Sequence, residues 1–284
     1  MNFFKNFPLV DVDIQKDGRV MQMVNTFRSV RPLQNFIDQP SLYTFYNIKN
    51  GERPDIVSQR LYGTQEYYWT FFVINEFLHD GYRAWPMSQE VLHAYLDDEY
   101  SGTVITTRPD IDRDSDGGIK EFTNSLAGEN RNYSATDATR YKINETVTGS
   151  VSGASGKLVK KNMDLNQLVI KEVTNGPFVE NDLITGQTSG ASVSAYQVYK
   201  YADAPHHYHL VGDKEERYIT PSFIVSDDAV TLYGPDVAIP SNNYEIKTNR
   251  QYINSQNESR SRIRVLQPDY IGQFVEEFEK LINA

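Results

Sequence analysis

The segment Tyr46–Asn75 constrains the fold of this chain more than any other part of the sequence. The aromatic and aliphatic residues of Phe45–Ile48 predict a short strand, and Asn50-Gly51 is a strong turn signal. A helical pattern begins at Pro54, in a first turn where the missing N–H of proline costs little, and breaks at Gly63. The pattern restarts after this glycine and continues to the end of the segment. The sequence therefore predicts a strand followed by two helices.

Two more helices are indicated further along the chain. Ser88–Tyr100 has amphipathic spacing, and Ser88 is a good candidate for its N-cap. Arg260–Leu266 predicts a strand, and Pro268 then opens a helix whose apolar residues give the cleanest helical periodicity in the chain. These apolar positions are Ile271, Phe274, Val275, Phe278, Leu281 and Ile282.

An internal repeat marks the middle of the chain. Residues 141–155 and 178–192 align at an offset of 37 positions, and each copy contains a strand, a Thr-Gly turn and the sequence Ser-Gly-Ala-Ser. The surrounding residues 101–205 are rich in Gly, Ser, Thr and Val, a composition that favours an all-β insertion. Two copies predict a small pseudo-symmetric barrel or sandwich. The chain is accordingly divided into an extended leader (1–40), a helical module (41–100), this insertion (101–205) and a C-terminal strand and helix region (206–284).

Composition limits the classes of function. The 284 residues suffice for about two domains, and the formal net charge of −10 argues against binding to nucleic acid or to anionic membranes. The absence of cysteine excludes disulfides and thiolate chemistry. The N-terminus has no basic start followed by a long apolar run, and no apolar run approaches the length of a membrane span. We therefore expect a soluble protein that is made in the cytosol, or assembled there into something larger.

An acidic run, Asp110–Gly118, matches the first half of a calcium-binding EF-hand loop. The bidentate glutamate of such a loop is missing, because its position is occupied by Thr123. A solvated acidic loop is the preferred interpretation, and calcium binding is the alternative. The matched positions are Asp112, Asp114, Asp116 and Gly117.

The run His206-His207-Tyr208-His209 is a metal candidate by composition. On a strand, His207 and His209 share one face while His206 takes the other, so at most two ligands converge. A polar strand is therefore the preferred interpretation. Other enzyme motifs are absent, and we predict a protein without catalytic residues, cofactor or metal. A glycosidase whose two carboxylates lie far apart in the chain stays open as an alternative that no pattern favours.

The second predicted helix and the C-terminal helix are rich in aromatic residues. Glu66–Asn75 carries more of them than one amphipathic face needs, so part of the segment should pack against another element or another chain. The candidate protein-interface residues are Tyr67, Tyr68, Trp69, Phe71, Phe72, Phe274 and Phe278.

The order of elements around Gly63 resembles the LysM fold, a small βααβ module. The resemblance predicts an α+β protein in which a LysM-like module lies within a mixed α/β scaffold that also carries the all-β insertion. Two departures are visible: Pro54 stands where glycan-binding LysM modules carry an aliphatic residue, and the first helix is one residue longer. The matching positions are Tyr46, Ile48, Gly51-Glu52, Ile56–Tyr62, Gly63, Tyr67–Ile74 and Asn75.

These departures, with Leu61-Tyr62-Gly63, Tyr68-Trp69 and Trp85-Pro86, resemble the baseplate wedge subunits encoded by gene 53 of T-even-like contractile phages. The resemblance covers roughly residues 1–100 and 206–284, while the β-repeat insertion is an accessory. It implies a non-enzymatic virion protein of the tail baseplate. Such a protein contacts other wedge proteins and links neighbouring wedges into a six-fold ring around the hub.

A second hypothesis is a peptidoglycan-binding LysM protein associated with a tail lysozyme. Pro54 and the missing catalytic domain count against it. A third hypothesis is a structural core whose β-repeat insertion binds glycans, other tail components or the host. The Ser/Thr/Gly-rich turns of the insertion fit each of these ligands equally well.

Overall fold

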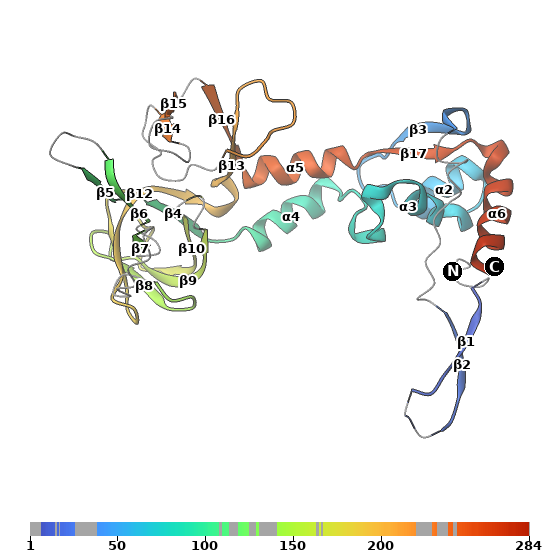
Figure 1. Ribbon diagram of the computed structural model, residues 1–284, viewed down its shortest axis with the longest axis horizontal. Helices are drawn as coiled ribbons and strands as arrows, with labels where there is room; N and C mark the ends of the chain where they lie inside the picture. The colour runs from blue at the N-terminus through green and yellow to red at the C-terminus, as the bar shows by residue number, and fades with distance from the viewer. Residues whose placement is uncertain are drawn as a thin grey trace. The chain divides into compact units, whose positions relative to one another are not determined.

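The computed structural model folds into two compact units (Figure 1). Unit 1 comprises Met1–Leu92 and Ser255–Ala284, and unit 2 comprises His93–Asn254. Unit 1 thus combines residues from the predicted regions 1–40, 41–100 and 206–284, and unit 2 contains residues 93–100, the predicted insertion and residues 206–254. The structure describes residues 7–14, 16, 18–25, 39–107, 110–113, 119–124, 129–130, 141–162, 165, 167–219, 229–231, 238–240 and 243–283.

The centre of unit 1 has the predicted strand–helix–helix order. Strand β3 (Tyr43–Asn47) is followed by α2 (Pro54–Tyr62), a 3-10 turn and α3 (Trp69–Ile74). The second strand, β17 (Arg262–Leu266), comes from the C-terminal part of the chain and pairs antiparallel with β3. The predicted C-terminal strand and helix are confirmed, since α6 (Ile271–Asn283) follows β17.

Local sequence explains the limits of α2. Pro54 occupies the first turn, and Gly63 ends the helix at a φ of 72°, a left-handed conformation that glycine adopts without strain. The N–H of Gly63 donates to the carbonyl of Gln59, as expected for a glycine-ended helix. The predicted start at Pro54 and break at Gly63 are therefore confirmed.

Two helices cross the boundaries between the units. The helix α4 (Gln89–Glu99) confirms the prediction for Ser88–Tyr100, and the Ser88 hydroxyl accepts a hydrogen bond from Val91 N–H at 3.3 Å. The helix α5 (Asn249–Ser259) precedes β17. Within unit 1, Met87 N–H donates to Asn257 Oδ1 at 2.7 Å, and Asn257 Nδ2 donates to the Met87 carbonyl at 3.0 Å. The two points at which the chain leaves and rejoins unit 1 are therefore neighbours, which suits an insertion.

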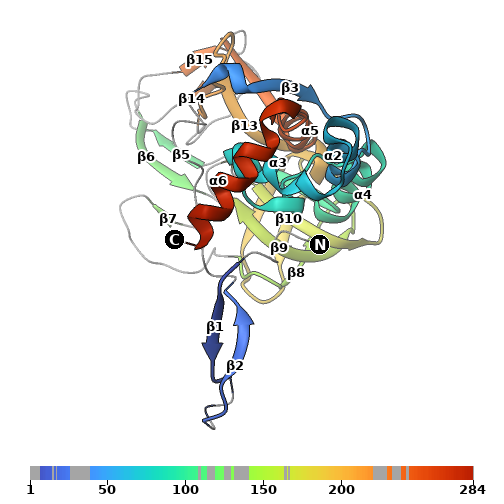
Figure 2. The same ribbon diagram turned by 90° about the vertical axis from the view of Figure 1, so that its right-hand side faces the viewer.

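A hairpin lies near the N-terminus of unit 1 (Figure 2). It consists of β1 (Leu9–Val12) and β2 (Met21–Val24), with Val10 opposite Met23 and Val12 opposite Met21. Both strands lie within the predicted extended leader (1–40), on either side of Asp17-Gly18, of which only Gly18 is among the described residues.

Unit 2 is built around a closed six-stranded barrel with the order β10-β4-β12-β11-β8-β9. This confirms a barrel rather than a sandwich for the repeat region. The barrel strands are β4 (Thr103–Thr107), β8 (Thr146–Gly149), β9 (Ser155–Asn162), β10 (Gln167–Thr174), β11 (Leu183–Gly186) and β12 (Ser192–Lys200).

Shorter sheets complete the described part of unit 2. A three-stranded sheet has the order β5-β6-β7, and two-stranded sheets pair β13 with β16 and β14 with β15. Their bounds are β5 (Asp110–Arg113), β6 (Ile119–Asn124), β7 (Glu129–Asn130), β13 (Pro205–Leu210), β14 (Ala229–Thr231), β15 (Ala238–Pro240) and β16 (Tyr244–Thr248).

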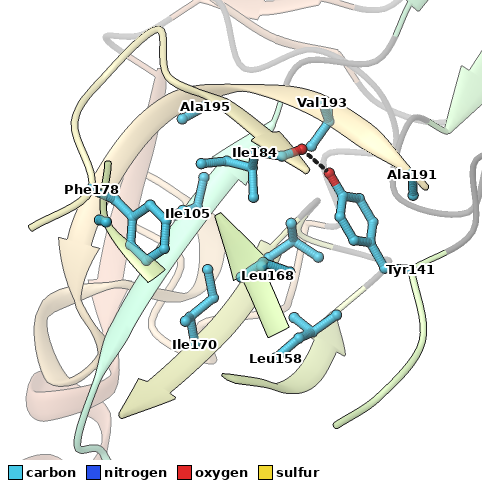
Figure 3. Close-up of a cluster of buried hydrophobic side chains, with 12 residues drawn as sticks. Ile105, Tyr141, Leu158, Leu168, Ile170, Phe178, Ile184, Ala191, Val193 and Ala195 are labelled. Carbon is cyan, nitrogen blue, oxygen red and sulfur yellow. Dashed lines mark hydrogen bonds between the residues drawn. The ribbon is translucent and has the colours of Figure 1, made fainter. Parts of the chain in front are cut away.

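Equivalent residues of the two repeats contribute to the barrel core. Tyr141 and Phe178 occupy the same repeat position, and both are buried in the cluster shown in Figure 3. The tyrosine hydroxyl donates to the Ile184 carbonyl at 2.6 Å, a contact that Phe178 cannot make. Thr148 pairs with Thr185, its own equivalent at the 37-residue offset, so a pseudo-two-fold axis passes between β8 and β11.

The fold is therefore α+β, as the sequence predicts. Most helices lie in unit 1 or, like α5, cross its boundary, and unit 2 contains the barrel. Within the described residues, no helix has the length and apolar character that crossing a bilayer requires.

Candidate protein interaction surfaces

Four of the seven predicted interface residues lie in the interior of unit 1. Trp69 packs on the two phenylalanines of α6, with ring centroids 4.8 Å from Phe278 and 6.2 Å from Phe274. Phe71 is fully buried in a second cluster, beside Trp85 at 6.2 Å. In this structure the C-terminal helix thus docks on the chain's own α3, and the contacts of these four side chains are intramolecular.

The other three predicted residues keep exposed atoms. Tyr67, Tyr68 and Phe72 are half-buried, and Tyr68 and Phe72 lie beside the exposed Tyr82, with ring centroids 6.0 and 5.5 Å away. Burial raises the pKa of Tyr68, so its hydroxyl stays neutral and can donate a hydrogen bond. These rings form the part of the predicted aromatic set that a partner protein can reach.

The turn after β3 is held by one carboxylate. Glu52 Oε2 accepts from the Tyr46 hydroxyl at 2.8 Å and from Lys49 N–H at 3.1 Å, and Arg60 forms an ion pair with the same side chain. Trp85 Nε1–H donates to the Glu52 carbonyl at 2.7 Å. The Gly-acidic turn and the Trp-Pro pair noted in the sequence therefore meet at a structural anchor.

The hairpin is the most exposed apolar element of unit 1. Opposed residues of an antiparallel pair share a face, so Val10, Val12, Met21 and Met23 form one apolar face. Met21 is 59% exposed and Met23 is 44% exposed. An isolated two-stranded hairpin is marginally stable in water, so these side chains are suited to packing against another surface.

Each repeat of the barrel contributes a carboxylate that accepts hydrogen bonds from the turn of the other repeat. Glu145 of the first copy accepts from Thr188 N–H at 3.0 Å and from Ser189 N–H and Oγ–H at 2.8 Å, all in the turn of the second copy. At the equivalent position, Asp182 accepts from Val151 N–H at 2.7 Å and from the Ser152 hydroxyl, both in the turn of the first copy.

Glycine makes room for both carboxylates. A Cβ at Gly149 would lie 2.0 Å from Asp182 Oδ2, and a Cβ at Gly186 would lie 2.8 Å from Glu145 Oε1. Burial alone would raise the pKa of Glu145, but the hydrogen bonds from Ser189, Lys142 and Thr188 hold it below its ordinary value. Sequence reasoning missed this pair, although an acidic residue four positions before glycine in both repeats was the available signal.

The histidine run lies on β13. His207 and His209 share one face as predicted, with ring centroids 5.5 Å apart. The prediction that His206 takes the other face is wrong, because the register shifts between Pro205 and His207 and brings the Nδ1 atoms of His206 and His207 to 2.8 Å. His207 and His209 are buried while His206 is half-buried, and the His207 ring stacks on Tyr218 at 4.1 Å. Burial, together with the neighbouring His206 and His209, lowers the pKa of His207 to about 4. Across the described parts of the chain, no three His, Asp or Glu side chains group closely enough to hold a metal ion.

The predicted calcium loop is only partly described. Asp110 and Asp112 belong to β5, where Asp110 pairs with Thr123 of the neighbouring strand. Asp114, Asp116 and Gly117 lie outside the described residues.

Residues 1–124 match the family model described as base plate wedge protein 53. No curated protein matches the chain. The matched residues include the hairpin, β3, the helices α2 to α4 and the first barrel strand. The match supports a structural role in a phage baseplate, with protein partners there, and confirms the resemblance predicted from the sequence. Residues 1–124, slightly less than half of the chain, are therefore similar to the family of base plate wedge protein 53.

Proposed function

We propose that this chain is a structural baseplate protein of a contractile phage tail that links neighbouring wedges into a six-fold ring around the hub. The observation that carries the proposal is the family match over residues 1–124, which contains most of unit 1. The proposed localisation is the virion, after assembly in the host cytoplasm, and the proposed role requires neither catalysis nor a cofactor.

Unit 1 is the proposed linking module. Its order of β3, α2, α3 and antiparallel β17 follows the βααβ order of a LysM-like module, with the last strand supplied from the far end of the sequence. Pro54 is buried in the first turn of α2, where its role is structural. We therefore favour protein contacts over glycan binding for this module.

Two surfaces of unit 1 are proposed to contact neighbouring wedge proteins. One is the apolar hairpin face of Val10, Val12, Met21 and Met23. The other is the predicted aromatic set, in which Tyr67, Tyr68 and Phe72 supply accessible rings while Trp69, Phe71, Phe274 and Phe278 support them from the core. Large apolar and aromatic side chains are the usual anchors of such interfaces.

Complementation of a phage that lacks this gene tests the proposal. The variant Val10→Ser/Val12→Ser/Met21→Ser/Met23→Ser should fold and yet fail to support baseplate assembly, which is scored by electron microscopy of lysates. The matched control, Asp11→Ser/Gln22→Ser, changes the other face of the hairpin and should assemble normally. Normal baseplates without this chain would refute the proposal, and so would retention of the purified chain on peptidoglycan combined with normal assembly by the four-serine variant.

A further inference from the structure

The two outer edges of the β3–β17 sheet differ. On the β17 side, the side chain of Asn75 bonds both backbone polar groups of Arg264, so this edge is capped. Between the two strands, Ile48 N–H donates to the Ser261 carbonyl and Gln267 N–H donates to the Leu42 carbonyl. These two bonds show which residues of β3 face β17. Because such bonds alternate along a strand, the backbone groups of Phe45 and Asn47 point away from β17.

Among the described residues, no strand pairs with this outer edge of β3. In the portion of the chain that the structure describes, nothing bonds to the backbone N–H of Phe45 or Asn47. An exposed edge with unpaired donors and acceptors is a template for another extended chain. The edge therefore offers a docking position that the sheet itself leaves unused.

The exposed face beside this edge is aromatic and cationic. Phe45 is 59% exposed, and the guanidinium carbon of Arg262 lies 4.4 Å from its ring centroid. Arg264 is also exposed and lies directly opposite Phe45 in the register, on the same face. Ile263 and Val265, between and beside the two arginines, are buried on the other face.

Neither arginine is neutralised within the described residues, where no carboxylate lies within ion-pair distance of Arg262 or Arg264. The lack of a carboxylate beside them does not follow from composition, because the chain as a whole has 38 acidic and 28 basic residues. Two unpaired guanidinium groups around an exposed ring are suited to an anionic ligand that also presents an apolar surface.

We propose that β3 binds an extended acidic segment of another polypeptide by strand addition. The segment would pair with the backbone of Phe45 and Asn47, pack an apolar side chain on the Phe45 ring, and place carboxylates where Arg262 and Arg264 can bond them. The β3 edge does not include the hairpin, and its binding of an acidic segment does not depend on the baseplate role.

The alternatives fit this surface less well. A nucleic acid cannot continue a backbone ladder, and the net charge of −10 opposes its approach. A second copy of β3 would bring the same two arginines toward their equivalents, which is repulsive. An acidic polypeptide satisfies both the open edge and the charge.

Binding of fluorescent peptides to the full-length chain tests this proposal. A peptide of about eight residues with Glu, Val and Glu at every second position and Thr between them presents both kinds of side chain on one face. It should bind, with affinity falling as salt rises, whereas its Lys-for-Glu counterpart should not. The variant Arg262→Gln/Arg264→Gln should weaken binding about tenfold or more. Arg83→Gln/Lys280→Gln, which removes the same charge elsewhere on unit 1, should bind like the unmodified chain. Amide exchange at Phe45 and Asn47 should slow when the acidic peptide is present.

Three outcomes would overturn the proposal. One is the absence of acidic peptide binding to the unmodified chain, and another is equal binding by the Arg262→Gln/Arg264→Gln variant. The third is tight binding of an oligothymidine of matched charge without protection of the Phe45 and Asn47 amides, which would reassign the surface to nucleic acid.

Discussion

The side chain of Asn75 pairs with the backbone of Arg264 as if it were a neighbouring strand. Asn75 Nδ2 donates to the Arg264 carbonyl at 2.9 Å, and Arg264 N–H donates to Asn75 Oδ1 at 2.8 Å. Nδ2 also donates to the Phe71 carbonyl at 2.8 Å, and Asn75 is only 3% exposed. One buried amide thus ties the end of α3 to a strand from the far end of the chain.

We expect Asn75→Asp to destabilise unit 1. Aspartate keeps the acceptor for Arg264 N–H but removes the donor to the Arg264 carbonyl, which costs about 1–3 kcal/mol. The Phe71 carbonyl keeps the backbone N–H of residue 75 as a donor, at 3.2 Å. Urea unfolding, followed by tryptophan fluorescence because Trp69 and Trp85 are both in unit 1, measures the effect. The control Asn47→Ala removes an exposed side chain of β3 and should change the free energy of unfolding little. Equal stability of the two variants would contradict the role of Asn75.

The packing of α6 on α3 gives a second prediction. Phe278 is 5% exposed and contacts Trp69, so Phe278→Ala should cost about 3–5 kcal/mol through lost burial and the resulting cavity. Tyr270→Ala, at an exposed position just before α6, serves as the control and should cost much less. Fluorescence-detected unfolding compares the two, and similar losses would show that α6 is not docked as described.

The equivalent carboxylates of the barrel should respond differently to amide substitution. Glu145 accepts hydrogen bonds from three N–H groups and one hydroxyl. In Glu145→Gln, the new amide NH2 faces some of these donors, so we expect the free energy of unfolding to fall by about 1–3 kcal/mol. Asp182→Asn should cost less than about 0.5 kcal/mol, because the Ser152 hydroxyl can reverse and accept from the new amide. Calorimetric unfolding of both variants makes the comparison, and the reverse order of stability would refute the assigned hydrogen bonds.

Acid should destabilise unit 2 through His207. The unfolded chain takes up this proton near the ordinary pKa of 6.5, whereas the pKa of the buried histidine is lowered to about 4. The unfolded state therefore binds more protons between these values, and stability falls as the pH drops from 6.5 toward 4. His207→Phe keeps an aromatic ring on Tyr218 and should flatten this part of the pH profile. The control Tyr218→Phe retains all three histidines and should preserve the fall in stability between pH 6.5 and 4. Thermal unfolding at a series of pH values measures this dependence for both variants.

Local elements were predictable because their signals are local. Proline at the start of α2 and glycine at its end act through their own backbone conformations, so Pro54 and Gly63 were placed correctly. The barrel followed from a repeat that the sequence displays directly. The alternation of His207 and His209 on one face needed only the two-residue period of a strand.

Contacts between residues far apart in the chain were less predictable from the sequence. Nothing in Arg262–Leu266 indicates that this strand joins β3, because strand periodicity does not specify a partner. Aromatic density at Trp69 and Phe71 likewise signals burial without saying whether the covering surface belongs to the same chain. The structure shows that α6 covers Trp69 and that Phe71 is buried in the cluster around Trp85, while the hairpin carries exposed apolar side chains.

A cryo-electron microscopy map of the assembled tail baseplate tests the central claim most directly. The account predicts density for unit 1 in the inner baseplate with six-fold repetition, its hairpin and aromatic rings in contact with proteins of neighbouring wedges. Absence of the chain from the particle, or a peripheral position without contacts between wedges, would contradict it.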